Sequence, residues 1–348
     1  MTCHVHSFRR LRVRTAVPSF STSARSRQKL YWLNLHGSGI SAIERLVIEE
    51  ALLRHDPAQR SWGIVGAHDP THQNRLSLHK DNIAAPGAIR NLNCVIVMGI
   101  GGKVNKLLDV DRVKKDGVQV VRRFSGGGTV VLDHNSLWTT FIGRNKDLPH
   151  VPPYPRELMR WTSEEIFGPA FREMKQLVMK QVEKKKTLVQ GGGTPFHSSS
   201  EGQMTQLSSN DRDMGGIPDF DLVENDYVLG ERKIGGNAQS ITKDGWLHHT
   251  SFLWDYDEMH MSYLALPEKR PKYRKSRDHD DFLVKLSSHY GHIEGGKRAL
   301  FEEMKKATEK VFDVEELSLS DALSIIDSEL GGVQEFYDGR CRTKLVEF

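Results

Sequence analysis

The chain contains, between residues 121 and 131, the stretch Val121-Arg122-Arg123-Phe124-Ser125-Gly126-Gly127-Gly128-Thr129-Val130-Val131. Its β-branched ends predict two strands, and the three consecutive glycines predict a loop between them. A run of glycines loses much conformational entropy on folding, so it indicates backbone that approaches a ligand closely or adopts positive φ. The N–H groups of such a loop can hold an anion, and a neighbouring guanidinium can bind a carboxylate or phosphate. We therefore expect a binding site here, with a solvent-facing hairpin as the alternative.

The spacing excludes two well-known phosphate loops. No Gly-Lys-Ser/Thr follows the glycines, as a Walker loop requires, and the Gly-x-Gly-x-x-Gly spacing of a dinucleotide site is absent.

A second glycine-containing stretch runs from residue 224 to residue 239: Glu224-Asn225-Asp226-Tyr227-Val228-Leu229-Gly230-Glu231-Arg232-Lys233-Ile234-Gly235-Gly236-Asn237-Ala238-Gln239. We expect a hairpin turn at 229–232 and Lys233 on an otherwise apolar strand. The glycines that follow would let this ammonium point into a cleft, where a fixed cation stabilises negative charge that develops during a reaction. Asp226, across the hairpin, could hold a magnesium–phosphate complex through its carboxylate. A solvated strand lysine is the alternative interpretation.

Two adjacent histidines, His248 and His249, lie on the next expected strand. Neighbouring side chains of a strand point to opposite faces, so the two rings cannot bind one metal ion from the same face. We expect one of them to line a pocket and do not expect a histidine metal site.

Strand-like and helix-like patterns are mixed along the chain. Ser41 followed by Glu44 is a capping box that opens an amphipathic helix over 41–54, and apolar residues recur at helical intervals over 156–182. Strands are expected at 62–65, 94–98, 118–122, 129–132, 137–142, 220–228, 233–241 and 246–253. This pattern predicts an α/β (α+β) fold in which a mixed β-sheet is flanked by helices.

Two further segments depart from this pattern. Residues 184–216 are rich in Lys, Gly and Ser, and we expect a flexible insertion on the surface. Helices over 281–290, 297–312 and 320–330, the last capped by Ser320 or Asp321, form a short helical C-terminal extension at 286–348.

The N-terminus has its own composition. Residues 1–29 hold seven Arg or Lys residues and no acid, which is typical of an organelle transit peptide, mitochondrial in preference to plastid, with a disordered basic tail as the alternative. These seven charges exceed the net charge of +4 and leave the rest of the chain at −3. The basic character therefore belongs to the leader, and we expect no nucleic-acid partner.

Other features restrict the class of protein. The longest apolar runs are well short of the roughly 20 residues that cross a bilayer, so no membrane span is expected. The three cysteines, Cys3, Cys94 and Cys341, are too few and too scattered for a disulfide framework or a zinc site. We expect a monomer.

Five stretches, in this order, resemble the lipoate-protein ligase A family, within the wider biotin and lipoate ligase superfamily. They are Ile48-Glu49-Glu50-Ala51, Arg123-x-Ser125-Gly126-Gly127-Gly128, Lys233-Ile-Gly-Gly-Asn-Ala-Gln239, His248-His249, and Pro267-Glu-Lys-Arg-Pro271-x-Tyr273-Arg274-x-x-Arg277-x-His279-x-x-Phe282. The resemblance implies a catalytic domain over residues 30–285. The chain departs from the family at Leu132-Asp133, where His-Asp is common, and at Thr250-Ser251, where Gly-Thr often follows the histidines.

The resemblance implies an ATP-dependent lipoate-protein ligase. Such an enzyme activates lipoate, or octanoate, as an acyl adenylate with Mg²⁺, and passes the acyl group to a lysine of an acceptor. The acceptors would be lipoyl domains of 2-oxoacid dehydrogenase complexes or the glycine-cleavage H protein. Lys233 would be the catalytic residue, and Asp226 would face the metal. Further residues would bind the acyl adenylate: Arg123, Ser125, Gly126, Gly127, Gly128, Asn225, Asp226, Gly235, Gly236, Ala238 and His249.

Two alternatives remain beside the ligase. A lipoyl or octanoyl transferase would work without ATP activation, but its thioester form needs an exposed, activated cysteine near the lysine motif, and the sequence has none there. A catalytically inactive lipoyl-domain-binding protein would keep only the fold. The joint presence of Arg123, the three glycines and Lys233 favours an enzyme.

Overall fold

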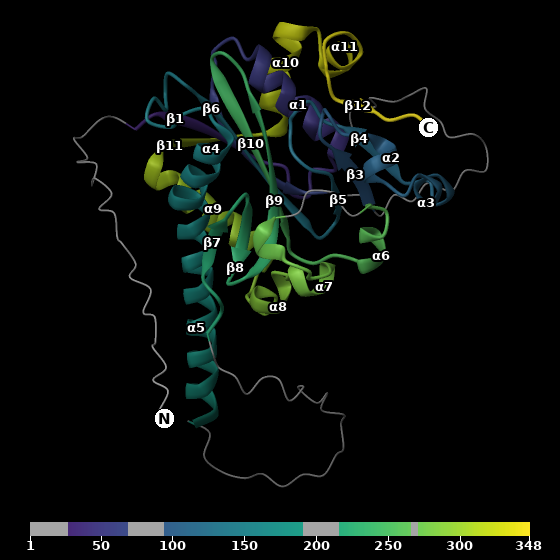
Figure 1. Cartoon of the computed structure of the whole chain (residues 1–348). Helices are drawn as coiled ribbons and strands as arrows, with labels where there is room; N and C mark the ends of the chain where they lie inside the picture. Colours follow the sequence, from purple (N-terminus) through teal and green to yellow (C-terminus); the bar gives the residue numbers. More distant parts are fainter. Residues whose placement is uncertain (1–26, 69–93, 191–215, 266–270) are drawn as a thin grey trace, which may run out of the picture.

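The computed structural model describes residues 27–68, 94–190, 216–265 and 271–348 (Figure 1). An eight-stranded sheet forms its centre, in the order β11-β1-β2-β6-β10-β9-β8-β7. The strand β1 pairs in parallel with β2 and β11, whereas the remaining pairs are antiparallel, so the sheet is mixed as expected. Its strands are β1 (Lys29–Asn34), β2 (Ser61–Ala67), β6 (Ser136–Arg144), β7 (Phe220–Val223), β8 (Asp226–Leu229), β9 (Arg232–Ile241), β10 (Gly245–Leu253) and β11 (Asp313–Leu317).

A second, four-stranded sheet carries the first glycine stretch. Its order is β12-β4-β3-β5, with bounds β3 (Cys94–Met98), β4 (Gln119–Arg122), β5 (Val130–Asp133) and β12 (Lys344–Leu345). The strands β3 and β4 are parallel, and the other two pairs are antiparallel. Since β4 and β5 flank β3, the loop at 123–129 that joins them crosses the end of β3, and its Gly126 contacts Gln239 on strand β9 of the large sheet.

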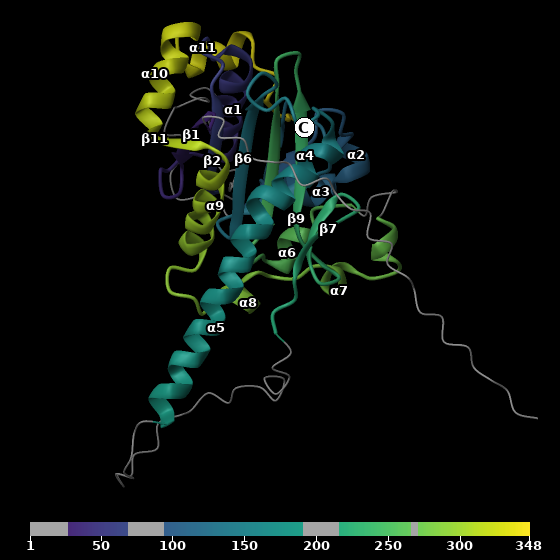
Figure 2. The ribbon, with the colours of Figure 1, turned by 90° about the vertical axis from the view of Figure 1, so that its left-hand side faces the viewer.

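Helices cover both faces of the large sheet (Figures 1 and 2). One face packs against α4 (Pro155–Thr162), a π-helical turn at Ser163–Phe167, α5 (Gly168–Gln190), α8 (Ser287–Tyr290) and α9 (Lys297–Val311). The other face packs against α1 (Ala42–His55), α10 (Leu319–Leu330), α11 (Val333–Gly339) and the small sheet. Alternation along β6 explains the two cores, since Phe141 enters the first and Ile142 the second.

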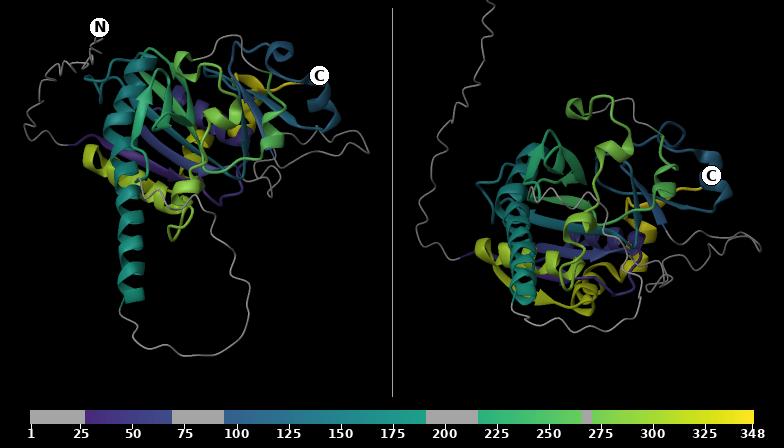
Figure 3. Two further views of the ribbon diagram at one scale, coloured as in Figure 1. Left: turned by 60° about the horizontal axis from the view of Figure 1, so that its bottom comes forward. Right: turned by 90° about the horizontal axis from the view of Figure 1, so that it is seen from below.

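The remaining helical segments are short and lie in connections. They are α2 (Val104–Leu107), α3 (Val110–Lys115), α6 (Glu258–Met261), the 3₁₀ turn Lys272–Arg274 and α7 (His279–Phe282). The longest helix, α5, extends well beyond the sheets, as the views in Figure 3 show. None of the helices in the described ranges is both long enough and apolar enough to cross a bilayer.

Local patterns placed most of these elements correctly. Ser41 and Glu44 form the expected capping box, with Ser41 N–H donating to Glu44 Oε2 at 2.8 Å. The expected strands at 62–65, 94–98, 118–122, 129–132, 137–142, 233–241 and 246–253 all appear within one or two residues of their predicted bounds, and the turn at 229–232 is present.

Four local predictions need correction. The segment expected to begin a flexible insertion at residue 184 is helical to Gln190, because Lys, Gln and Leu favour helix; residues 191–215 lie outside the described part. The single strand expected at 220–228 is the hairpin β7–β8, whose turn holds Glu224 at φ 54°. The single helix expected at 281–290 is two short helices, α7 and α8. Ser318 caps α10, in place of Ser320 or Asp321.

The segment 286–348 is built into both sheets. Strand β11 pairs with β1, where Lys29 Nζ lies 2.6 Å from Glu315 Oε2, and β12 pairs with β4. The fully buried carboxylate of Glu50 accepts hydrogen bonds from the backbone N–H and the hydroxyl of Thr343, each at 3.0 Å. The predicted boundary at 285 therefore does not separate a domain, since strand pairing across the whole chain is invisible to local pattern. The predicted leader, residues 1–29, lies outside the described part up to residue 26, and β1 begins at Lys29.

Candidate functional site

The glycine loop between β4 and β5 is held against strand β9. Gly126 N–H donates to the carbonyl of Gln239 at 2.9 Å. Gly127 has φ 104°, and a Cβ there would lie 2.9 Å from Nη2 of Arg123 and 3.0 Å from Cβ of Ala238. A Cβ at Gly99, in the loop after β3, would lie 2.4 Å from the carbonyl oxygen of Gly127. Glycine is required because three backbone segments meet here more closely than side chains allow.

Arg123 is buried next to this loop without a carboxylate partner in the described part of the chain. Its guanidinium donates to the carbonyls of Gly128 at 2.7 Å, Gly126 at 2.9 Å and Val97 at 3.3 Å. The side chain is 4% exposed, and burial lowers the pKa of Arg123 to about 10. Its Nε is buried without a hydrogen-bond partner in the described residues. A buried cation without a counter-charge attracts an anionic ligand, and its bonds fix the shape of the loop.

Lys233 is the second residue of strand β9 and faces a carboxylate. Its Nζ lies 2.7 Å from Oδ1 of Asp226, on the neighbouring strand β8. Oδ2 of the same carboxylate accepts a hydrogen bond of 2.9 Å from the Tyr273 hydroxyl. Burial, followed by the charge of Asp226, raises the pKa of Tyr273, so the hydroxyl remains a donor. The Lys233 side chain is 25% exposed, which leaves the ammonium accessible from the pocket.

His249, on β10, belongs to a buried polar chain. Its Nε2 lies 2.6 Å from Oε2 of Glu49, and its Nδ1 lies 3.3 Å from Oγ of Ser125. Burial lowers the pKa of His249, whereas Arg45 and His249 hold the pKa of Glu49 below its usual value despite burial. A neutral imidazole therefore donates through Nε2 to an ionised Glu49 and accepts through Nδ1 from the Ser125 hydroxyl. His248 points the opposite way, with Nε2 3.0 Å from the hydroxyl of Tyr227, as the strand alternation predicted.

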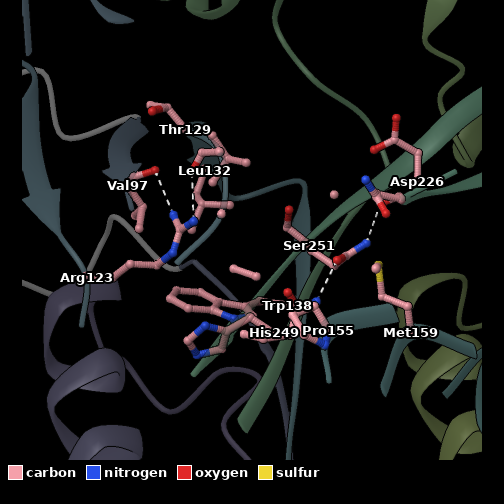
Figure 4. Close-up of a pocket in the computed structure, with 18 of the residues that line it drawn as sticks. Val97, Arg123, Thr129, Leu132, Trp138, Pro155, Met159, Asp226, His249 and Ser251 are labelled. Carbon is pink, nitrogen blue, oxygen red and sulfur yellow. Dashed lines mark hydrogen bonds between the residues drawn. The ribbon is translucent and has the colours of Figure 1, made fainter. Parts of the chain in front are cut away.

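These groups surround one pocket of about 400 Å³ between the two sheets (Figure 4). Arg123, the glycine loop and Thr129 line it from the small sheet, and Lys233 and Asp226 line it from the large one. An apolar wall completes it, formed by Val97, Val130, Leu132, Trp138 and Met159. Figure 4 shows Trp138 and His249 on the Arg123 side, with Met159 near Asp226 on the other. The pocket thus combines cations at separate points with an apolar surface.

Most of the residues selected from sequence reach this pocket. Those on its lining are Arg123, Gly127, Gly128, Asn225, Asp226, Lys233, Gly236, Ala238 and His249. Ser125, Gly126 and Gly235 are adjacent but do not line it: Ser125 is fully buried against His249, and Gly235 packs under Phe252.

Other lining residues were missed by sequence reasoning. Ser251 lies two residues after His249 on the same face of β10, and Trp138 is its register partner on β6, so strand alternation could have found both. Nothing local marks Met159 of α4 or connects Glu49 to a residue 200 positions away.

The described part of the pocket holds neither a preformed cluster of metal ligands nor a reactive thiol. No cluster of three or more His, Cys, Asp or Glu side chains suited to a metal ion occurs in the described ranges, so a metal could use only Asp226 together with ligand oxygens. Cys94 and Cys341 are buried outside the pocket lining, and burial raises the pKa of Cys94 to about 12. Neither thiol is available as a thiolate nucleophile at neutral pH.

The fold and the site define the class of protein. A glycine loop and a lysine strand that meet at a partly apolar pocket are the features that the sequence resemblance implied. The family described as "Lipoyl protein ligase A/B catalytic domain" matches residues 88–313, which is 226 of the 348 residues. The chain therefore belongs to the lipoyl protein ligase A/B family.

Two relatives illustrate the range of this family. The chain is 28% identical over 280 residues to the inactive lipoate–protein ligase 2 of Plasmodium falciparum, a match that covers 75% of this chain and 64% of that protein. It is 28% identical over 221 residues to the octanoyltransferase LipM of Geobacillus kaustophilus, covering 62% of this chain and 72% of that protein. The match thus spans less than two thirds of the length of the first relative.

Solved structures share the fold. A lipoate-protein ligase A bound with ATP superposes with a TM-score of 0.53 at 17% identity, covering 90% of this chain and 95% of that chain. The bi-partite lipoate protein ligase of Thermoplasma acidophilum, studied with its E2 lipoyl domain, gives a TM-score of 0.54 at 16% identity, covering 90% and 93%.

Proposed function

We propose that this protein is an ATP-dependent lipoate-protein ligase, which forms an acyl adenylate from lipoate or octanoate and transfers the acyl group to a protein lysine. One observation carries the proposal. Arg123 and Lys233, which stand on different sheets, line a single pocket that also has an apolar wall. An acyl adenylate has the matching chemistry, since it joins an apolar chain to an anionic phosphate through a mixed anhydride.

The apolar wall would hold the acyl chain. Leu132, Trp138 and Met159 offer it a water-poor surface, and about 400 Å³ lies within the usual range of small-molecule sites. Leu132 stands where the family commonly has histidine, so the wall is more apolar at this point than in those relatives.

Lys233 would supply the charge that the reaction needs. In the first step a carboxylate oxygen of the fatty acid attacks the α-phosphorus of ATP, and pyrophosphate leaves. In the second step the acceptor amine attacks the acyl carbon, AMP leaves, and the amine loses a proton. Negative charge grows on the carbonyl and phosphate oxygens in these steps, and a fixed ammonium beside them lowers both barriers. To reach those oxygens, Lys233 would exchange its contact with Asp226 for one with the ligand.

Asp226 fits the magnesium ion that adenylation requires. Mg²⁺ is usually held through one or two carboxylates together with substrate phosphates and water. When Lys233 turns to the ligand, Oδ1 of Asp226 becomes free to act as such a ligand, while Tyr273 keeps the carboxylate oriented through Oδ2. The ion would neutralise phosphate charge, and Asn225 lines the pocket beside it.

The acceptors would be lipoyl domains of 2-oxoacid dehydrogenase complexes or the glycine-cleavage H protein. We propose a monomeric, mitochondrial enzyme, with a plastid as the alternative compartment. The acid-free segment 1–29 supports this location, and a fluorescent fusion of that segment tests it: diffuse cytosolic signal would refute import.

Transfer without ATP activation is the second candidate, because one relative is named an octanoyltransferase and another an inactive ligase. A thioester route lacks support, since the two described cysteines are buried outside the pocket. A transferase that accepts only preformed acyl adenylate, or an inactive lipoyl-domain-binding protein, would use the same fold.

Lipoate-dependent exchange between ATP and pyrophosphate tests the proposal, with octanoate and biotin run in parallel. A ligase exchanges with lipoate or octanoate, and absence of exchange would refute ATP activation. Transfer from synthetic lipoyl adenylate then separates an adenylate-only transferase from a binding protein.

Lys233→Ala should abolish exchange and transfer while the protein stays folded. Lys175→Ala is the matched control, since Lys175 also pairs with a carboxylate, Asp219 at 2.7 Å, and has a side chain 31% exposed, but lies on α5 away from the pocket lining. A fully active Lys233→Ala variant would refute the assigned role.

A further inference from the structure

A second hollow of about 510 Å³ lies at the C-terminal end of α1 and shares no lining residue with the first. Four parts of the chain form it: residues 53–59, Arg144 at the end of β6, the β9–β10 turn at 242–244, and residues 340–342 after α11. We call it the basic cavity. Phe124 lies between the two hollows, with its ring 5.8 Å from the guanidinium carbon of Arg54 and 5.9 Å from the ring of His249.

Positive charge dominates the lining of the basic cavity. Five permanently cationic side chains face two carboxylates: Arg54, Arg144, Lys243, Arg340 and Arg342 against Asp56 and Asp244. Among the described residues, Leu53 is the one aliphatic side chain of the lining, and no aromatic carbocycle contributes. The cavity is therefore unsuited to an apolar ligand.

The inner charges have structural partners. Arg144 donates to the carbonyls of Leu52 and Leu53 at 2.8 Å each. These hydrogen bonds satisfy carbonyl groups that have no partner within the last turn of α1. Arg54 pairs with the buried carboxylate of Glu50 at 3.2 Å. Helix capping and ion pairing therefore explain these two arginines without a ligand.

The outer charges have no such explanation. Lys243, Arg340 and Arg342 come from two segments that are not part of α1, and their side chains make no ion pair or hydrogen bond with any residue in the described ranges. Positive charge affects His55, which also lines the cavity. Burial first, and then the charges of Arg340 and Arg54, lower the pKa of His55, and the charge of Glu50 opposes this shift only in part. Uncompensated cations that converge on a concave surface concentrate anions.

We propose that the basic cavity binds a small, charge-dense anion of the oligophosphate class. Guanidinium groups bind phosphate oxygens through paired N–H donors. Arg340 and Arg342 come from the segment after α11, and Lys243 comes from the turn between β9 and β10. A multivalent anion can contact both segments at once, which a single carboxylate or chloride cannot do.

Pyrophosphate is the probe, and the imidazole of His55 is the reporter. The titration of His55 in the full-length protein is followed by NMR with pyrophosphate and, separately, with sodium chloride at the same ionic strength. We expect pyrophosphate to raise the pKa of His55, because an anion offsets the charges of Arg340 and Arg54, and sodium chloride to raise it less. The proposal concerns a site apart from the first pocket, so the Lys233→Ala variant should give the same response.

The paired variant R340Q/R342Q removes two exposed guanidinium groups and is expected to stay folded. Pyrophosphate should bind it at least about tenfold more weakly, and the anion-dependent shift of His55 should vanish. Arg112→Gln, at an exposed arginine on α3, is the matched control and should bind as the parent does. A shift no larger than that caused by sodium chloride would overturn the proposal, and so would an undiminished shift in R340Q/R342Q. A shift produced by polyglutamate but not by pyrophosphate would equally overturn it in favour of an acidic protein partner.

Discussion

Replacing Gly127 with alanine should damage the fold as well as the site, whereas replacing Gly128 should damage the site alone. Only Gly127, among the three consecutive glycines, has positive φ, at 104°. An added Cβ there would lie 2.9 Å from Nη2 of Arg123 and 3.1 Å from the carbonyl oxygen of Asn237. A Cβ on Gly128 would meet nothing within 4 Å. The two variants thus add the same methyl group to neighbouring positions, but only the one at Gly127 is expected to destabilise the fold.

The cost at Gly127 follows from two contributions. An L-residue at positive φ is disfavoured by about 1–2 kcal/mol. The displaced guanidinium of Arg123 also weakens its bonds to the carbonyls of Gly126 and Gly128, each worth about 1 kcal/mol. Together these lower the free energy of unfolding by about 2–4 kcal/mol, which corresponds to a fall in Tm of roughly 3–7 °C for a protein of this size.

Thermal unfolding and ligand binding measure the two effects separately. Gly127→Ala should lower Tm and weaken binding of a lipoyl-adenylate analogue. Gly128→Ala should keep the parent Tm within about 1 °C, yet weaken binding, because Gly128 lines the pocket and its added methyl group would take up space that is open in the free protein. Equal losses of Tm in both variants would refute the assignment of strain to Gly127, and unchanged binding by Gly128→Ala would show that the ligand does not approach the loop.

Further expectations follow from the buried polar groups. Glu49→Gln should lower the free energy of unfolding by about 3–5 kcal/mol, because the buried guanidinium of Arg45 loses its counter-charge. Urea unfolding measures this loss, and a value below about 1 kcal/mol would contradict the reasoning. Burial lowers the pKa of His248 to about 3, so the unfolded ring takes up a proton below about pH 6.5 while the folded ring stays neutral. Stability should therefore fall as the pH drops from 6.5 toward 3. His248→Asn should reduce that slope by about 1 kcal/mol per pH unit, averaged between pH 7 and 5 in urea titrations, and an unaltered slope would disprove this. Because Cys94 and Cys341 are buried with raised pKa values, N-ethylmaleimide should leave acyl transfer by a Cys3→Ser variant unchanged, and inactivation would favour a thiol route.

Local chemistry made part of this structure predictable. The capping box at Ser41 and Glu44, the valine-rich strand at 94–98 and the turn at 229–232 depend on neighbours in sequence, and each formed where its residues indicated. The two histidines separated onto opposite faces for the same reason. The resemblance to a known family predicted that the glycine loop and the lysine strand belong to one site. Neither motif is specific alone, so local patterns without that resemblance would not have paired them.

Contacts between residues far apart in the sequence could not be predicted from local patterns. Strand β11 joins β1 across more than 280 residues, and the buried carboxylate of Glu50 binds Thr343 at a similar separation. A short, mostly acidic stretch such as Asp313–Leu317 has no hydrophobic periodicity that distinguishes a sheet edge from a loop. The basic cavity was hidden for the same reason, since its arginines come from segments that lie far apart in the sequence.

The two cations of the first pocket differ in how their charge is balanced, and this difference restricts which ligands can complete the site. Arg123 has no carboxylate partner in the described part of the chain, so an anion beside the glycine loop is attracted to it without breaking an ion pair. Lys233 must leave Asp226, a salt bridge of 2.7 Å, before it can serve a ligand. A fatty acid alone brings one negative charge and cannot satisfy both ends of the pocket. An acyl phosphate with a metal ion could, because Asp226 would hold the metal in place of the ammonium while Lys233 would face the anhydride. The full strength of the lysine contact is then available only when the reacting groups are present, which is the condition under which binding energy accelerates a reaction.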